Sequence, residues 1–184
     1  MKKIIRMLLI VIAMLLLAVP VSAKPSRKTV VKKYDQWRQK YVYNNKNKYS
    51  NPKTYLWDIN KDGVLEMIFQ YGNGKSSGFR VYTYKNGKIV LVQKLTGVKR
   101  FWGVQGKKYL VVDQDNNFKS GNYTVYKMNG TKMKRICIYR LTRRVVENGK
   151  PTTSYTRNGK RILETRFARF MRTVTEPTFS SFAY

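Results

Sequence analysis

The sequence predicts an α+β fold, in which an antiparallel β meander of about 8–9 strands is preceded and followed by an amphipathic helix. Three observations lead to this prediction. Apolar residues follow helical spacing near both ends of the chain, and short aromatic and β-branched runs fill its middle. Recurring Asn-Gly dipeptides separate those runs, and Asn-Gly between apolar segments is the strongest short-range signal of a hairpin.

Residues 1–23 have the layout of a secretory signal peptide. Three basic residues precede an apolar run from Met7 to Ala18, and Val21-Ser22-Ala23 offers small residues at a cleavage site. The apolar run is shorter than the ~20 residues that a membrane span needs, although an uncleaved anchor stays open as the alternative. We therefore expect residues 24–184 to form a single secreted domain.

The first helix is expected over residues 29–43. Apolar and aromatic side chains recur there at the spacing of one helix face, at Val30, Tyr34, Trp37 and Tyr41. Lys32, Lys33, Arg38 and Lys40 lie on the rest of the helix surface, as in a helix with one buried face. A polar stretch that Pro52 closes is expected to be a loop.

The antiparallel sheet is expected over residues 54–156. Hairpin turns are predicted at Asn86-Gly87 and Asn129-Gly130, and two more turns at Asn148-Gly149 and Asn158-Gly159. A second helix is expected over residues 160–174, where one face carries Leu163, Phe167, Phe170 and Val174. Pro177 ends that segment, and residues 178–184 are a candidate edge strand.

The chain carries a large excess of positive charge. Its 38 Lys and Arg face nine Asp and Glu, a formal net charge of +29, and removal of residues 1–23 leaves +26. A small domain needs a net charge of only ~2–8 for solubility, so solubility alone is the weaker explanation. With an export signal, the expected partners are anionic extracellular polymers or an anionic membrane surface, and not intracellular nucleic acid.

The residues that are missing narrow the chemistry. The chain has no histidine and a single cysteine, Cys137. It therefore has no Ser-His or Cys-His catalytic relay, no histidine metal site and no intramolecular disulfide. Cys137 lies in a strand-like run and is expected to pack as a small buried side chain. We expect no enzymatic activity.

One short segment concentrates acidic residues. Asp58, Asn60 and Asp62 alternate along the chain, Gly63 follows, and Glu66 lies three residues further on. Oxygen ligands at alternate positions followed by glycine form the start of a calcium-loop pattern. The candidate Ca²⁺ ligands are therefore the side chains of Asp58, Asn60, Asp62 and Glu66 and the backbone carbonyl of Val64.

This segment is not an EF-hand. Phe69 stands where an EF-hand needs a bidentate glutamate, and the flanking segments have strand patterns. A strand–loop–strand calcium loop of weak affinity, ~10⁻⁴–10⁻³ M, is one interpretation. The other is a metal-free turn, since Asp and Asn bind nearby backbone amides and Asp-Gly favours turns.

The loop resembles those of FG-GAP-type propeller blades. More narrowly, residues 55–68 resemble the acidic loop of a group of secreted proteins of Gram-positive bacteria. In that group a Tyr-containing helix precedes the loop, here residues 34–41. A Val-Tyr-x-Tyr-x-Asn-Gly-Lys hairpin and a Tyr-x-x-Asn-Gly-Lys turn before a helix follow it, here residues 81–88 and 155–167. The resemblance covers about residues 29–174 and implies an α+β extracellular domain without a particular activity.

The sequence therefore predicts a secreted, non-catalytic protein that binds anionic cell-wall or surface polymers by charge. A hydrolase of extracellular polysaccharide is one alternative, and it needs two carboxylates that face each other across roughly 5–9.5 Å. Asp113 and Asp115 form a second acidic cluster, which we interpret as a turn at a strand end. A membrane-active basic protein is the other alternative, with a helix from Arg161 to Thr173 lying on the lipid.

Overall fold

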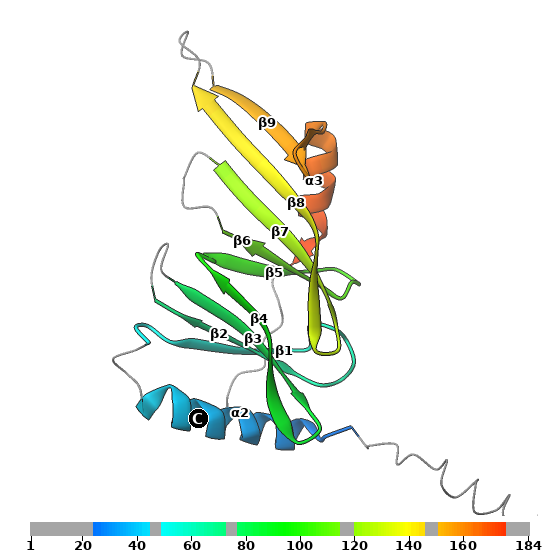
Figure 1. Ribbon diagram of the computed structural model, residues 1–184. Helices are drawn as coiled ribbons and strands as arrows, with labels where there is room; N and C mark the ends of the chain where they lie inside the picture. Colours follow the sequence, from blue (N-terminus) through cyan, green and yellow to red (C-terminus); the bar gives the residue numbers. More distant parts are fainter. Residues whose placement is uncertain (1–23, 45–48, 73–76, 115–119, 146–150, 176–184) are drawn as a thin grey trace, which may run out of the picture.

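The computed structural model describes residues 24–44, 49–72, 77–114, 120–145 and 151–175. Within these residues the chain forms two helices and eleven strands. The helices are α2 (Arg27–Tyr41) and α3 (Glu164–Thr173). None of the described helices is long and apolar enough to cross a membrane. The fold is thus α+β, and most of the described residues lie in antiparallel strands (Figure 1).

The strands form two separate antiparallel sheets. The four-stranded sheet has the order β1 (Lys53–Trp57), β2 (Glu66–Tyr71), β3 (Gly78–Lys85) and β4 (Lys88–Thr96). The seven-stranded sheet has the order β10 (Lys160–Arg161), β9 (Pro151–Arg157), β8 (Lys132–Val145), β7 (Ser120–Asn129), β6 (Tyr109–Asp113), β5 (Arg100–Val104) and β11 (Val174–Thr175).

Helices and sheets stack in four layers: α2, the four-stranded sheet, the seven-stranded sheet and α3 (Figure 1). Strand alternation explains the stacking, because successive side chains point to opposite faces of a sheet. In β2, Met67 and Phe69 pack with α2, whereas Ile68 packs with the second sheet. In β6, Leu110 and Val112 line the core between the sheets.

Helix α2 is fixed to its sheet by a cap and by a buried tyrosine. Ser26 accepts a hydrogen bond from the Thr29 amide at 3.2 Å, which explains why the helix begins at Arg27. The hydroxyl of the fully buried Tyr34 donates to the carbonyls of Leu65 and Tyr82, at 3.0 and 3.3 Å. One side chain therefore ties the helix to β3 and to the residue that precedes β2.

Two of the predicted Asn-Gly turns are confirmed. Asn86-Gly87 joins β3 to β4 with φ values of 49° and 77°, and Asn158-Gly159 joins β9 to β10 with 51° and 80°. Both positions at positive φ are what a type I′ turn requires. At the third site Asn129 is still paired with Lys132, so the turn lies one residue later. Asn148-Gly149 lies outside the described residues.

The prediction of one meander of about 8–9 strands is wrong: the described residues contain eleven strands in two sheets. The chain leaves the first sheet after β4 and begins the second at β5. The second helix starts at Glu164 and not at residue 160, because Lys160 and Arg161 pair with β9. The first helix spans residues 27–41 instead of 29–43. Residues 1–23 and 178–184 lie outside the described residues.

Candidate functional site

The acidic loop connects β1 to β2 and is organised by its own side chains. Asp58 accepts hydrogen bonds from two loop amides, that of Asp62 at 3.1 Å and that of Gly63 at 3.0 Å. Lys61 and Gly63 have positive φ values of 54° and 87°, so the backbone curls around the Asp58 carboxylate. The sequence favours this shape because glycine adopts such values without steric penalty.

Two further side chains complete the loop. Asn60 Oδ1 accepts from the Asp62 amide at 2.9 Å, and Asp62 Oδ1 accepts from the Val64 amide at 2.8 Å. Outside the loop, Lys24 Nζ donates to the Asp62 carbonyl at 2.7 Å. Asp and Asn side chains that bind amides two residues on form Asx turns, which hold a loop without a metal.

Glu66, the last residue of the acidic segment, is fully buried. Its Oε2 accepts from the Ile59 amide at 2.8 Å, and its Oε1 accepts from Thr83 Oγ1 at 3.1 Å and from Asn60 Nδ2 at 3.4 Å. Burial raises the pKa of this carboxyl to about 8, although the hydrogen bonds from Ile59 and Thr83 lower it. The charges of the neighbouring acidic loop residues raise the pKa further.

Four of the five predicted calcium ligands therefore lie in the loop, where Asp58 and Asn60 both accept from the Asp62 amide, and Glu66 is the first residue of β2. Asp58, Asn60 and Asp62 bind loop amides, and Glu66 binds donors of the protein interior. Among the described residues, no group of three or more Asp, Glu, His or Cys side chains is close enough to hold a metal ion. We place no metal here, and calcium binding stays a prediction.

The second acidic cluster is only partly described. Asp113, at the end of β6, is buried and forms an ion pair with Arg100, whose Nη2 lies 3.2 Å from Asp113 Oδ2. Arg100 also lies over the ring of Trp102, 5.3 Å from its centroid. Asp115 lies outside the described residues. Asp113 thus joins neighbouring strands, since β5 and β6 pair at this position.

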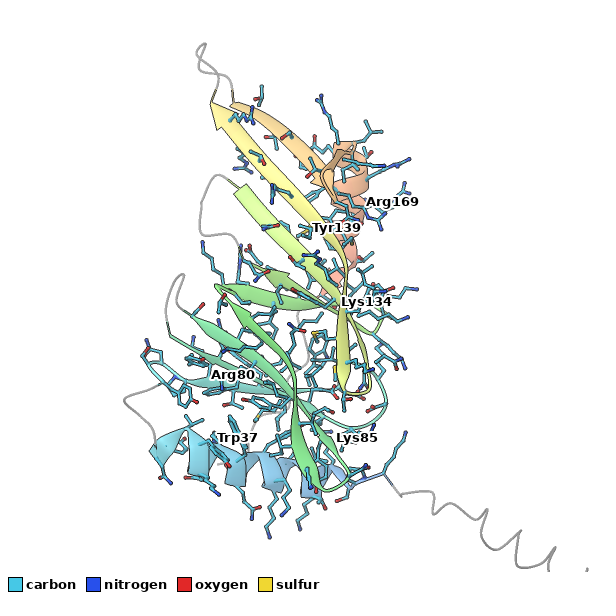
Figure 2. All side chains as sticks on the ribbon, viewed as in Figure 1. Trp37, Arg80, Lys85, Lys134, Tyr139 and Arg169 are labelled. Atoms are coloured by element: carbon cyan, nitrogen blue, oxygen red, sulfur yellow. The ribbon has the colours of Figure 1, made fainter. Side chains whose placement is uncertain are left out.

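Positive charge covers both sheets. Residues 24–96 contain 16 Lys and Arg against four Asp and Glu, and residues 97–175 contain 19 against four. Most basic side chains therefore have no carboxylate available to them. Figure 2 shows nitrogen-tipped side chains on every layer, including Lys85 on the β3–β4 hairpin, Lys134 on β8 and Arg169 on α3.

The seven-stranded sheet has two faces of different character. Under α3 the face is aromatic: Tyr139 stacks on Phe170 with 3.9 Å between ring centroids and 8° between planes, and Arg157 lies over the Tyr139 ring at 5.6 Å. Phe167 is buried there as well. These aromatic residues form the core beneath α3.

The opposite face of β8, β9 and β10 carries arginines and hydroxyl groups. We call it the hydroxyl–arginine face. It is made of Arg140, Thr142, Arg144, Thr152, Ser154, Thr156 and Arg161. Sequence reasoning missed it, although the alternation in Arg140-Leu-Thr-Arg-Arg144 and Thr152-Thr-Ser-Tyr-Thr156 was visible.

A groove lies where β1 and β2 approach the connection between β4 and β5. Its volume is about 650 Å³, and it is lined by Asn51, Pro52, Lys53, Gln70, Gly72, Ser77, Val98 and Lys99. A smaller hollow of about 240 Å³ shares Lys53, Gln70 and Lys99 with it and adds Tyr55, Arg100, Phe101 and Trp102. The lining of both contains basic side chains and no carboxylate.

No protein-family model, curated protein or solved structure matches this chain. The site must therefore be interpreted from its own geometry and charge.

Proposed function

We propose that this protein is a secreted, non-catalytic binding protein that attaches by charge to anionic extracellular polymers, above all those of the cell wall. One observation carries the proposal: 38 basic residues face nine acidic ones, and both sheets share the excess. Such a net charge opposes folding through self-repulsion. A polyanion that binds the folded protein relieves that repulsion, so the charge has a use at the surface.

The way the acidic residues are used supports a non-catalytic protein. Asp58 and Asp62 accept amide hydrogen bonds of their own loop, and Glu66 is buried behind them. The groove beside β1 and β2 is lined by lysines and offers no carboxylate pair. A hydrolase that uses two opposed carboxylates has no support in this arrangement.

The packing of α3 favours a polymer over a membrane as the partner. Its apolar side chains Phe167 and Phe170 pack on the seven-stranded sheet. A helix that lies on a membrane needs its apolar face free to enter the lipid. Leu163, which precedes the helix and is 69% exposed, is one large apolar side chain at this end of the protein that faces solvent.

The test is retention on purified cell walls. The protein should stay bound at low salt and elute as NaCl rises, because ions screen charges beyond about 8 Å at physiological ionic strength. If retention does not change between about 0.05 and about 1 M NaCl, the proposal is refuted. Leakage from anionic vesicles would favour the membrane-active alternative, and soluble saccharide released from the walls would favour the hydrolase.

A further inference from the structure

We infer that the hydroxyl–arginine face is the docking surface for the polymer, and that the polymer is an extended chain of repeated oxyanion groups, with phosphate as the preferred group. This inference rests on the proposed function and adds to it the surface and the ligand class. Strand register, exposure, arginine chemistry and the distribution of acidic residues support it.

The register places the residues on one face. Arg140 pairs with Thr156, and Thr156 pairs with Arg161 across the next strand, so a threonine separates the two arginines. Arg144 pairs with Thr152. Because directly paired residues and residues two apart share a face, all of these side chains project from the same side of the sheet.

That side is the one turned away from α3. Tyr139 packs on Phe170 of α3, so the next residue in β8, Arg140, points to the other side. Arg140, Arg144 and Arg161 are exposed. Figure 1 shows the ends of β8 and β9 reaching past the four-stranded sheet, so that sheet leaves this part of the face uncovered.

The spacing suits a linear ligand. Four residues along a strand separate Arg140 from Arg144, or ~13 Å at the usual rise per residue. Two strand spacings separate Arg140 from Arg161, or roughly 10 Å. A flat surface with cations at such intervals fits an extended chain better than a compact ligand, because each anionic group along the chain meets a different arginine.

The choice of arginine points to oxyanions. A guanidinium presents its donors in a planar fork that matches phosphate or carboxylate with two hydrogen bonds, whereas lysine offers a point charge. All three cations of this face are arginines. Threonine is common in strands for steric reasons, so its presence alone does not indicate a binding site. Beside the arginines, however, the threonine hydroxyls can donate to the oxyanion oxygens that the guanidinium groups do not bind.

No carboxylate competes for these arginines within the described part of the chain. No described ion pair or hydrogen bond involves the guanidinium groups of Arg140, Arg144 or Arg161. The described acidic residues of this half are occupied elsewhere: Asp113 pairs with Arg100, and Glu164 accepts from the Tyr155 hydroxyl at 3.1 Å on the side of α3. The face therefore presents donors and positive charge together.

The experiment compares two triple variants of the full protein that lose the same charge from opposite sides of one sheet. The face variant is Arg140→Gln/Arg144→Gln/Arg161→Gln. The matched control is Arg166→Gln/Arg169→Gln/Arg172→Gln, whose three arginines are exposed on α3. Binding of linear polyphosphate is measured over a series of NaCl concentrations, and thermal melting verifies that both variants are folded.

The face variant should bind polyphosphate on the order of tenfold more weakly or worse, since hydrogen bonds to charged groups are strong. Its log–log salt slope should fall by about 2, at ~0.7 per lost contact with a single-stranded polyanion. The control should stay close to the wild-type protein. A third variant with lysine at positions 140, 144 and 161 keeps the charge but should still bind more weakly, because the fork is lost.

The outcomes separate the two proposals. Equal losses in the face variant and the control would overturn the docking surface and leave the charge-based function standing. Binding of the wild-type protein that ignores salt would overturn the function itself. Stronger binding of polygalacturonate than of polyphosphate, compared at equal numbers of charges, would overturn the assignment of phosphate in favour of carboxylate.

Discussion

The buried carboxyl of Glu66 should make the protein lose stability as the pH rises through neutrality. Burial raises the pKa of Glu66 to about 8, while the amide of Ile59 and the hydroxyl of Thr83 partly counter the shift. The nearby charges of Asp62 and Asp58 raise the pKa as well. In the folded protein the carboxyl therefore stays protonated up to a pH at which the unfolded chain has released the proton.

The sign follows from proton binding. Between pH 4.5 and about 8 the folded state holds more protons than the unfolded state at this residue, so the free energy of unfolding decreases with pH. The stabilisation is fully present below the unfolded pKa and is lost as the pH passes the folded one. The slope approaches about 1.4 kcal/mol per pH unit, and the whole span is on the order of 5 kcal/mol.

No histidine titrates in this pH range, so the effect of Glu66 can be measured without that interference. The sequence contains no histidine, so no other type of side chain has an ordinary pKa near neutrality. Urea unfolding at pH 5, 6, 7 and 8, in the presence of EGTA, measures the free energy of unfolding at each pH. These pH values cover the range over which the free energy of unfolding is predicted to fall. A flat or rising profile for the wild-type protein would refute the reasoning.

Glu66→Gln is the matched variant. Glutamine has a similar shape and stays neutral, and its Oε1 can accept from the Ile59 amide as Glu66 Oε2 does. Its Nε2 takes the place of the oxygen that accepts from Thr83 Oγ1 and Asn60 Nδ2, so the Thr83 hydroxyl must turn to accept and the long Asn60 contact is lost. The variant should match the wild-type protein within about 1 kcal/mol at pH 5 and exceed it at pH 8. Each kcal/mol should appear as roughly 2–4 °C in melting temperature. An equal loss at every pH would show that Glu66 is ionised throughout.

Three further predictions concern the loop, the first helix and a hairpin. If the loop binds calcium with a Kd of ~10⁻⁴–10⁻³ M, about 10 mM CaCl₂ should stabilise the protein by about 1.4–2.7 kcal/mol. The Asp58→Asn/Asp62→Asn variant should lose this stabilisation. An unchanged melting curve of the wild-type protein would mean that the loop is a metal-free turn. Tyr34→Phe should lower the free energy of unfolding, measured in urea, by about 1–3 kcal/mol, because two buried carbonyls lose their hydrogen-bond donor. An unchanged free energy would mean that a water molecule replaces the tyrosine hydroxyl as donor. Asn158→Ala should speed amide exchange at Ile138, whose N–H donates to Asn158 Oδ1 at 2.9 Å, while Asn158→Asp, which keeps an acceptor, should change it less.

The sequence predicted the features that depend on a few neighbouring residues. Asn86-Gly87 and Asn158-Gly159 form hairpins because both residues of each pair adopt positive φ. Both helices form where apolar residues recur at helical spacing. At Asn129 the turn is displaced by one residue, and a bulge at Val125 and Tyr126 alters the register of the same pair of strands. Whether a hairpin forms depends on the residues of its turn, whereas the register of its two strands depends on residues further away.

The features that depend on distant residues escaped prediction. Alternation shows that Ile68 and Phe69 face opposite ways, but it does not show that one meets a second sheet and the other a helix. The pairing of Val174 with Val104, which brings the end of α3 to the edge of β5, joins segments far apart in the chain. The acidic loop was located correctly by its motif, yet the motif did not show that Glu66 points into the core.

The hydroxyl–arginine face and the aromatic core beneath α3 come from one alternating pattern. In β8 the odd positions Cys137 and Tyr139 pack toward α3, so the even positions Arg140 and Arg144 must point away from it. A shift of one residue in the pairing of β8 would bury the arginines and expose the aromatic rings. The burial that fixes the register therefore also fixes where the positive charge lies. For this reason, substitutions on the exposed face should change binding without changing the fold, whereas substitutions beneath α3 should change both.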